Sequence, residues 1–397
     1  MRLRHSLIVL AIGLCTGLCT ADEKPHPKIE IRNPAASFLN IGGRRAELAR
    51  ATNPRVLEAL KWNKSCVNAD QPAPPPGRMV IPHHYLSGSN GPVNPQEWIA
   101  TLPYRNLNDV ASNGATRYVA TGDSAEAVCV ANLLSRWAAT GALLSYSYSE
   151  SSQAWYQVEW TLSSVSLAWS VVQSDPAVPA AQRAQISKWM HRVAEYMFDQ
   201  DPHPGDTAHE NNHAYWRALC ATSVGIFTSD EMLYHRGLAQ YARAIGQMNP
   251  DGSFPLEMAR HENALHYQSF ALAPLIMIAE LAAQQGTDIY SVQANRHTIA
   301  DAVDFLVRAS ADPQLVKKYA AEPQTFLLFS GEKPPAWIEF WAARHPGKLI
   351  TRNSPPVNSL SADSPLSKTW SGLLTTPLYD ATIGGDTTIY AAPARAK

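Results

Sequence analysis

The sequence has no surplus of positive charge. Its 397 residues include 33 Lys and Arg against 34 Asp and Glu, a formal net charge of −1. A protein that binds nucleic acid through its phosphates normally carries a clear basic excess. We therefore expect no nucleic acid partner, and any other anionic polymer would have to bind in a local basic groove.

Several motifs that identify common enzyme classes are also missing. There is no glycine-rich nucleotide-binding loop and no Gly-x-Ser-x-Gly nucleophile elbow. His203, His209 and His213 do not have zinc-type spacing with an accompanying carboxylate motif. We therefore predict that the protein uses neither a metal nor a cofactor.

Cysteine is rare, and two of the five cysteines lie in a segment typical of an export signal. Arg2 and Arg4 precede an apolar run over 6–18, and Cys19-Thr20-Ala21 forms a small-residue cleavage site. The run is shorter than the ~18 apolar residues that span a membrane. We expect cleavage after Ala21, a periplasmic or secreted mature protein, and no membrane association after cleavage. The mature chain then has 31 basic and 34 acidic residues, a net charge of −3.

The mature chain keeps Cys66, Cys129 and Cys220, an odd number for an oxidising compartment. Cys129 and Cys220 lie in apolar helical patterns, which favours two buried thiols over a disulfide between them. A single disulfide that includes Cys66 stays open.

Strand signals are sparse, whereas helical patterns extend from about 105 to 345. Asp123 followed by Glu126 is typical of a capping box, and Gly141 stands where the helix would end. Apolar residues at helical spacing predict helices over 123–141, 154–172, 180–199, 212–226, 230–247, 262–284, 296–309 and 337–344.

Helices of this length with short connections favour antiparallel helix pairs. We predict an all-α fold, an α/α toroid in which such pairs form an incomplete barrel with a cleft at its concave end. Residues 22–60 are mixed and polar, residues 71–77 form a Pro-rich loop, and the chain becomes rich in loops from about 345. We expect one domain over 22–397.

The first candidate site lies at Asn211-Asn212-His213-Ala214-Tyr215-Trp216. A lone histidine is commonly structural, but two amides, an imidazole and two large aromatic side chains in six residues are costly to bury without a purpose. One asparagine can cap the helix that begins here. The other amide is then free to face a cleft.

A second candidate site follows the Asp251-Gly252-Ser253 turn. Arg260, Asn263 and Tyr267 are spaced so that one helix would present all three on one face. The alternative is a surface ion pair between Arg260 and Glu257, with Tyr267 as a packing residue. Together the two clusters supply amide, imidazole, guanidinium and phenol groups, which can neutralise a carboxylate and move a neighbouring carbon-bound proton. This chemistry is β-elimination in a polymer of uronic acids.

Several stretches resemble the alginate lyase family, which cleaves poly-β-D-mannuronate. They are Asn-Asn-His-x-Tyr-Trp at 211–216, Asp-Gly-Ser-x-Pro-Leu-Glu-Met-x-Arg at 251–260, Ala-Leu-x-Tyr at 264–267 and Ala-Leu-x-Pro-Leu at 271–275. Residues 131–137 resemble the helix of that family that carries a tryptophan. Trp337, Glu339 and the Gly384-Gly385-Asp386 turn resemble its C-terminal part, so the resemblance covers roughly 66 to 390.

The resemblance implies a role for each matching residue. Asn212 and Arg260 would neutralise the carboxylate with help from His213, and Tyr267 would be both the base and the acid. Residues that would contact an anionic polysaccharide are Asn211, Tyr215, Trp216, His84, Tyr85, Trp137 and His266. We expect the protein to act as a monomer.

The stereochemistry of the sugar explains the double role of Tyr267. In mannuronate and glucuronate the C5 hydrogen and the C4 oxygen lie on the same side, so one phenol can serve both. In guluronate they lie on opposite sides, and two groups would be needed. Because a free phenol has a pKa of ~10, we expect Arg260 and His213 to favour the ionised form of Tyr267.

The chain departs from the family pattern in two places. His83-His84-Tyr85 stands where the family has Ser-Lys-Tyr, and Thr382 replaces an arginine before the Gly-Gly turn. A permanent cation is thereby exchanged for an imidazole that ordinarily titrates near ~6.5. Both changes reduce the positive charge of the groove and bear on the choice between mannuronan and glucuronan.

Three alternatives to a mannuronate lyase therefore stay open. A glucuronan lyase would use the same residues, because the two sugars differ only at C2. An inverting glycoside hydrolase would need two carboxylates ~6.5–9.5 Å apart, for which Glu210, Glu257 and Glu262 are the candidates. A polysaccharide-binding or export-scaffold protein would bind the polymer without turnover.

Overall fold

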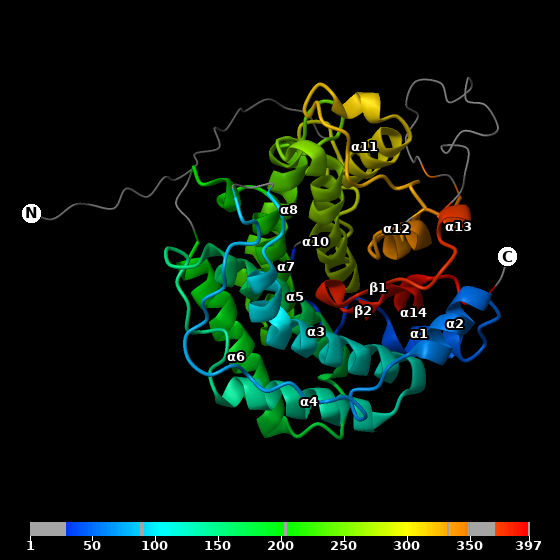
Figure 1. Ribbon diagram of the computed structural model, residues 1–397. Helices are drawn as coiled ribbons and strands as arrows, with labels where there is room; N and C mark the ends of the chain where they lie inside the picture. The colour runs from blue at the N-terminus through cyan, green and yellow to red at the C-terminus, as the bar shows by residue number, and fades with distance from the viewer. Residues whose placement is uncertain are drawn as a thin grey trace, which may run out of the picture.

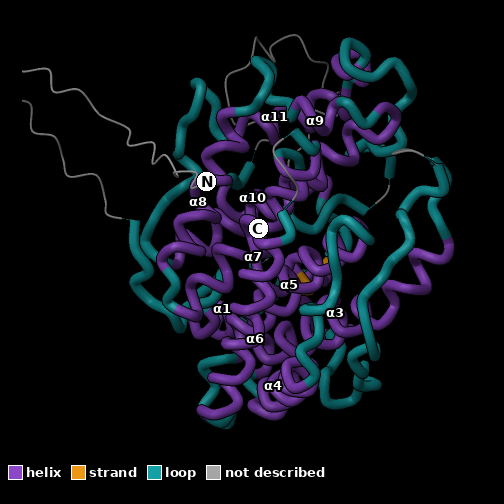
Figure 2. Tube along the Cα trace, turned by 90° about the vertical axis from the view of Figure 1, so that its left-hand side faces the viewer, coloured by secondary structure: helices purple, strands orange, loops and turns teal. Residues whose placement is uncertain are grey.

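The computed structural model describes residues 29–395 except 88–90, 202–204, 332, 348 and 350–369. The predicted export signal at 1–21 lies outside the described residues, as does most of the segment predicted to be rich in loops. What is described is mostly helical, with loops between the helices and very little strand (Figure 1; Figure 2). A two-residue antiparallel pair, β1 (Tyr379–Asp380) and β2 (Gly385–Asp386), pairs Tyr379 with Asp386.

The α-helices of the described residues include the eight that apolar periodicity predicts, each with bounds close to the predicted ones. They are α1 (Ile41–Leu48), α2 (Pro54–Trp62), α3 (Pro95–Thr121), α4 (Ser124–Ala139), α5 (Ser152–Val172), α6 (Ala180–Asp199), α7 (Asn212–Thr228), α8 (Glu231–Gly246), α9 (Pro255–Met258), α10 (Ala264–Gln284), α11 (Ile299–Ala311), α12 (Ile338–Arg344), α13 (Trp370–Leu373) and α14 (Thr387–Ala391). Short 3₁₀ helices are η1 (Thr207–His209), η2 (His261–Asn263), η3 (Pro313–Val316) and η6 (Ala381–Ile383).

The long helices form two layers, which confirms the prediction of an α/α toroid. The inner helices α3, α5, α7 and α10 pack each against the next, and α4, α6, α8 and α11 pack on them from outside. Nearly every residue of α5 and α7 is buried, as expected for helices covered on all sides. His261–Gln284 is long and apolar enough to span a membrane, but it is mostly buried inside this core.

Side-chain caps determine where several helices start. Asp123 caps α4 by accepting from the backbone N–H of Ala125, and Gly141 follows its end with φ of +65°. The predicted capping box is wrong, because Glu126 accepts hydrogen bonds from Ser65 and from the backbone N–H of Cys66. Glu126 therefore fastens the preceding loop to α4.

The sequence pattern missed α1, α2 and the first turns of α3. Residues 22–60 read as mixed and polar because buried arginines occupy positions that apolar residues normally fill. Arg44 donates to the carbonyls of Thr388, Ile389 and Ala392. The missed helices thus bind the C-terminal part of the chain through polar contacts, which leave no apolar periodicity in the sequence.

The C-terminal segment closes the toroid against these first helices, and Figure 1 shows α1, α2 and α14 side by side. Arg55 of α2 pairs with buried Glu339 of α12, to which Thr388 also donates. Gly385, with φ of +123°, packs so tightly on α3 that a Cβ would lie 2.6 Å from Thr116 Oγ1. This close approach holds the preceding turn, including Thr382, against the inner helices.

A disulfide joins Cys66 to Cys129. The expectation of a buried thiol at Cys129 is therefore wrong, although Cys220 is a buried free thiol as expected. Periodicity placed Cys129 on a helix but carried no information about the loop that packs on it. The bond attaches the loop before α3 to the outer helix α4.

Replacing Cys66 and Cys129 together by alanine is expected to lower the free energy of unfolding by about 2–4 kcal/mol. The bond joins residues 63 positions apart, and its loss gives the unfolded chain more conformational freedom. Denaturant titration measures the change. A Cys220→Ala control keeps the disulfide, so reductant should destabilise it as much as the wild type. Unchanged stability in the double variant would contradict the prediction.

Candidate active site

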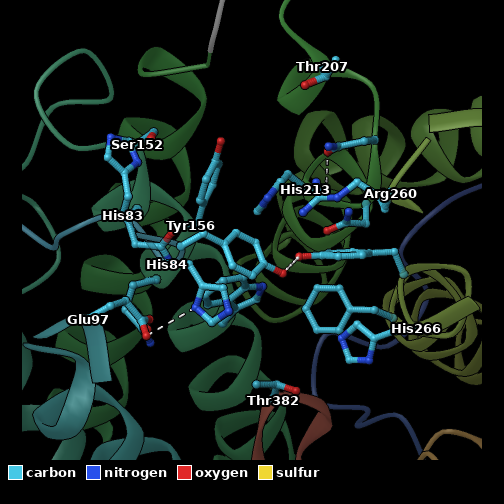
Figure 3. Close-up of a pocket in the computed structure, with 18 of the residues that line it drawn as sticks. His83, His84, Glu97, Ser152, Tyr156, Thr207, His213, Arg260, His266 and Thr382 are labelled. Atoms are coloured by element: carbon cyan, nitrogen blue, oxygen red, sulfur yellow. Dashed lines mark hydrogen bonds and ion pairs between the residues drawn. The ribbon is translucent and has the colours of Figure 1, made fainter. Parts of the chain in front are cut away.

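A cavity of about 550 Å³ opens at one end of the inner helix layer. It is lined by His83, His84, Tyr85, Glu97, Arg105, Asn108, Ser152, Gln153, Tyr156, Gln157, Trp160, Thr207, Asn211, Asn212, His213, Arg260, His266, Tyr267, Phe270 and Thr382. Figure 3 shows His84 and Glu97 on one side, with Arg260 and His266 on the other. The cavity brings together the four predicted catalytic residues and four of the seven predicted contact residues.

Each inner helix reaches the cavity with its N-terminal half. The lining residues of α7 are its first two, and those of α5 and α10 lie within their first turns. The partial positive charge of the helix dipole makes helix N-termini favourable for anions. The cavity is therefore suited to a negatively charged ligand although the chain as a whole has no basic excess.

The two adjacent asparagines have different tasks. Asn211 caps α7, because its Oδ1 accepts from the backbone N–H of His213 at 3.0 Å. Asn212 donates through its backbone N and its side-chain Nδ2 to the two carboxylate oxygens of Glu257, at 2.7 and 2.9 Å. Asn212 Oδ1 is buried without a hydrogen-bond partner among the described residues. The prediction that one asparagine caps and the other faces the cleft agrees with this geometry.

Glu257 is fully buried directly behind Asn212. Burial raises its pKa to about 7, although the bonds from Asn212 and the charge of Arg260 act in the opposite direction. The surface ion pair between Arg260 and Glu257, offered as the alternative, does not form between these two described residues. The contact between Glu257 and Asn212 was not predicted from the sequence.

His213 is held by a second buried carboxylate. Its Nδ1 lies 2.8 Å from Glu159 Oε2, while Arg217 donates to Glu159 Oε1 at 3.0 Å. Because a carboxylate accepts a hydrogen bond, we assign a proton to Nδ1, which leaves Nε2 for the cavity. The imidazole also stacks on Tyr156, with ring centroids 3.7 Å apart. Both contacts fix the orientation of the ring.

Arg260 and Tyr267 meet, but not in the predicted way. α10 begins only at Ala264, and Arg260 precedes the short helix η2, so the two residues do not share one helix. His261, with φ of +52°, interrupts the expected helical run. The Arg260 guanidinium nevertheless lies 3.8 Å from the centre of the Tyr267 ring. Asn263, expected on the same face, bonds to Thr325 and does not line the cavity.

The surroundings of Tyr267 favour its neutral phenol form. Burial raises its pKa above the ordinary value, and this outweighs the opposing effect of Arg260. Its hydroxyl lies 3.1 Å from that of Tyr85, which also favours the protonated form. The expectation that Arg260 favours the phenolate agrees with the direction of its effect, but the loss of hydration is larger, so the pKa of Tyr267 is raised overall.

The side of the cavity with the unusual histidines also carries a carboxylate. His83 and His84 both line the cavity, and His84 Nδ1 lies 3.4 Å from Glu97 Oε2. Glu97 is only 1% exposed, and Arg105 lies 3.8 Å from its other oxygen. On the opposite side, burial and the charges of Arg260 and His84 lower the pKa of His266.

Three predicted contact residues do not reach the cavity. Trp137 and Trp216 are fully buried and Tyr215 nearly so. Trp137 donates its indole N–H to the carbonyl of Pro72, and Tyr215 packs on Phe254. The family resemblance implied that they contact substrate, but their side chains lie in the packing between helices.

The aromatic groups that do line the cavity come from other helices. Tyr156 and Trp160 lie four residues apart on α5, on the face that also carries Gln153 and Gln157, and Phe270 lies on α10. The spacing of these amides and rings along one helix face was a readable signal. It was missed because the helix was judged only by its apolar stripe.

The carboxylates do not match an inverting hydrolase. Glu97 is the one carboxylate among the described residues that line the cavity. Glu257 lies behind Asn212, and Glu210 and Glu262 do not line the cavity. The paired carboxylates required for water attack are therefore missing from the described lining.

Several known proteins that are similar to this chain are lyases that act on polysaccharides. A family model described as alginate lyase matches residues 86–316. A polysaccharide lyase of Stenotrophomonas maltophilia K279a is 34% identical over 306 residues, covering 75% of this chain and 88% of that protein. An alginate lyase of Pseudomonas putida KT2440 is 29% identical over 232 residues, 57% of this chain and 61% of that protein.

Solved structures extend the similarity to nearly the whole chain. Alginate lyase A1-III from Sphingomonas species A1 superposes with a TM-score of 0.79 at 38% identity, covering 92% of this chain and 99% of that one. A variant of A1-III complexed with a tetrasaccharide gives a TM-score of 0.81 at 37% identity, covering 92% and 98%.

The buried carboxyl of Glu257 is expected to make stability depend on pH. Its pKa rises from 4.5 to about 7 on folding, so the folded protein keeps a proton that the unfolded chain has released. Stability from this group is complete below about pH 4.5 and is lost as the pH rises through about 7.

Denaturation of the wild type and Glu257→Gln at about pH 4.5 and pH 8 tests this. The wild type should lose more stability across the window, by an amount on the order of 2–3 kcal/mol. Comparing the two proteins removes the contribution of the other carboxylates to the pH dependence, because it is the same in both. Equal losses in both proteins would mean that the Glu257 pKa is not raised.

Proposed function

The chain belongs to the alginate lyase family, and from this premise we propose that it is a polysaccharide lyase that cleaves alginate by β-elimination, with β-D-mannuronate as its preferred unit. The observation that carries the proposal is the meeting of Asn212, His213, Arg260 and Tyr267 around one cavity. These groups are four parts of one reaction, and the chain brings them together from α7, the turn after α9, and α10.

The first part of the reaction is neutralisation of the sugar carboxylate. A C5 hydrogen becomes acidic only when the charge that develops on the neighbouring carboxyl group is held by donors. Arg260 supplies a fixed positive charge, and Asn212 and His213 supply oriented polar groups beside it. Since all three are held by buried partners or by ring contacts, little reorganisation is required when substrate binds.

The second part is transfer of the proton. The phenolate of Tyr267 takes the C5 hydrogen, and the phenol then gives that proton to the O4 leaving group as the C4–O4 bond breaks. Tyr267 thus ends the cycle in the state in which it began. Because burial raises its pKa, the reactive form is a small fraction at neutral pH, and the rate should increase toward alkaline pH.

The cavity also supports a glucuronate polymer as a second candidate substrate. Thr382 lines the cavity where the family resemblance implies an arginine, and Glu97 adds negative charge beside His84. Mannuronate and glucuronate share the same-side arrangement at C4 and C5. The two substrates therefore require the same catalytic groups and differ only in contacts at C2.

We also propose that the mature protein is a single-domain monomer in the periplasm or outside the cell. The basic and apolar pattern of residues 1–21 supports export. The contacts of α1 and α2 with the C-terminal helices support one folding unit.

Ultraviolet absorbance of the new C4=C5 bond tests the proposed reaction. Purified protein should generate the chromophore fastest on polymannuronate, more slowly on glucuronan, and least on polyguluronate. New reducing ends without the chromophore would indicate hydrolysis. Polymer binding without either product would indicate a binding protein.

Replacing Tyr267 by phenylalanine is expected to reduce turnover by about 10⁴-fold while polymer affinity stays nearly unchanged. The reason is that one hydroxyl serves both proton transfers. Initial rates and polymer binding, measured separately, give the two quantities. Tyr241→Phe, which removes a buried hydroxyl outside the cavity, is the matched control. A Tyr267→Phe rate above a tenth of wild type would remove Tyr267 from proton transfer.

Replacing His84 by lysine is expected to strengthen polymer affinity by about 2–5-fold. His84 lines the cavity, and lysine places a full positive charge there for an anionic polymer to bind. Apparent affinity for polymannuronate is measured in the wild type, His84→Lys and His83→Lys. Equal affinities for the wild type and His84→Lys would exclude His84 from the substrate site.

A further inference from the structure

We propose that Glu257 is a positioning residue for the elimination, acting through Asn212 by fixing the direction in which its amide faces the substrate. This inference rests on the proposed function of the cavity, and it assigns a task to a group that does not itself line the cavity. Glu257 is placed there by α9, the short helix that follows the Asp251-Gly252-Ser253 turn.

Two hydrogen bonds join Asn212 to Glu257. Both carboxylate oxygens of Glu257 are used, one by the backbone N–H of Asn212 and the other by its Nδ2. The χ2 torsion of an asparagine has a broad, roughly two-fold preference. An unrestrained amide can therefore rotate so that Oδ1 and Nδ2 exchange positions. A carboxylate accepts and does not donate, and it therefore selects the orientation with Nδ2 toward Glu257.

This orientation determines what Asn212 offers to a ligand. With one Nδ2 hydrogen committed to Glu257, the remaining groups are the second Nδ2 hydrogen and Oδ1. Asn212 lines the cavity, and its Oδ1 is buried with no partner among the described residues. A buried acceptor without a partner is costly, and a hydrogen-bond donor on the sugar would remove that cost.

Helix capping alone does not explain Glu257. The start of α7 is already capped by Asn211, and the bond from Asn212 Nδ2 contributes nothing to the helix backbone. Glu257 has no Lys, Arg or His within ion-pair distance among the described residues, whereas Glu159, which holds His213, is paired with Arg217. A buried carboxylate without a cationic partner lowers stability, and orienting Asn212 is the task for which the site keeps it.

The charged and ionisable neighbours of Glu257 are few. Arg260 follows it in the same segment, Tyr215 approaches from α7, and Tyr267 approaches from α10. Burial raises the pKa of both tyrosines, so both stay neutral at mildly acidic and neutral pH. The group in this set that changes charge near neutral pH is therefore Glu257 itself.

A double-mutant cycle on turnover tests the inference. Glu257→Gln, Asn212→Ala and the double variant are assayed by the ultraviolet chromophore on the polymer that the wild type cleaves fastest. Glu257→Gln alone should lower kcat by about 10-fold or more and change KM little, because a misdirected polar group costs transition-state stabilisation. In the Asn212→Ala background the same substitution should change kcat by less than about 3-fold.

The pH profile of kcat/KM gives a second readout that a purely structural role would not alter. The wild type should lose activity below about pH 7 as Glu257 gains a proton, and Glu257→Gln should lack this acid limb. Glu257→Asp, which keeps the charge, should retain the limb and recover part of the activity. It also serves as the test variant if Glu257→Gln does not fold. Glu262→Gln, an equivalent change outside the cavity, should match the wild type.

The outcomes separate this inference from the function on which it rests. If the wild type forms no chromophore on any of the three polymers, the proposed lyase function fails and the inference fails with it. If the wild type is active but Glu257→Gln costs the same factor with and without Asn212, only the inference is overturned. Persistence of the acid limb in Glu257→Gln would likewise overturn the inference and leave the lyase function intact.

Discussion

The site depends on one constraint, which is that the inner helices all bring their N-terminal halves to the same end of the toroid. Four such halves surround the cavity, and each N-terminus carries a partial positive charge. A chain with no net basic charge can therefore present an anion-binding cavity. The same geometry places Asn212 and His213 at the start of α7, where their side chains project from a rigid element.

Two buried carboxylates orient these two residues, and they differ in a way that matters. Glu159 holds His213 and is itself bonded to Arg217. Glu257 holds Asn212 without a cationic partner among the described residues, and its pKa rises to about 7. The support of Asn212 therefore depends on the pH of the solution.

Much of the fold could be predicted because apolar periodicity and caps such as Asp123 and Gly141 are local signals. α1 and α2 were not predicted, because buried Arg44 and Arg55 bind carbonyl and carboxylate groups far away in sequence, which no local pattern reveals. The catalytic cluster could be predicted from its unusual density of polar groups. The disulfide of Cys129, the buried positions of Trp137 and Trp216, and the raised pKa of Tyr267 all depend on contacts far apart in sequence, and they became visible only in three dimensions.

The closure of the toroid between α1 and the C-terminal helix α14 has a consequence for folding. Arg44 bonds to the carbonyl of Ile389 across 345 positions of sequence, and the turn that carries Thr382 is held by the same C-terminal packing. Contacts of such long range are slow to form. The seam is therefore expected to close late in folding, and the substrate cavity is complete only once it has closed.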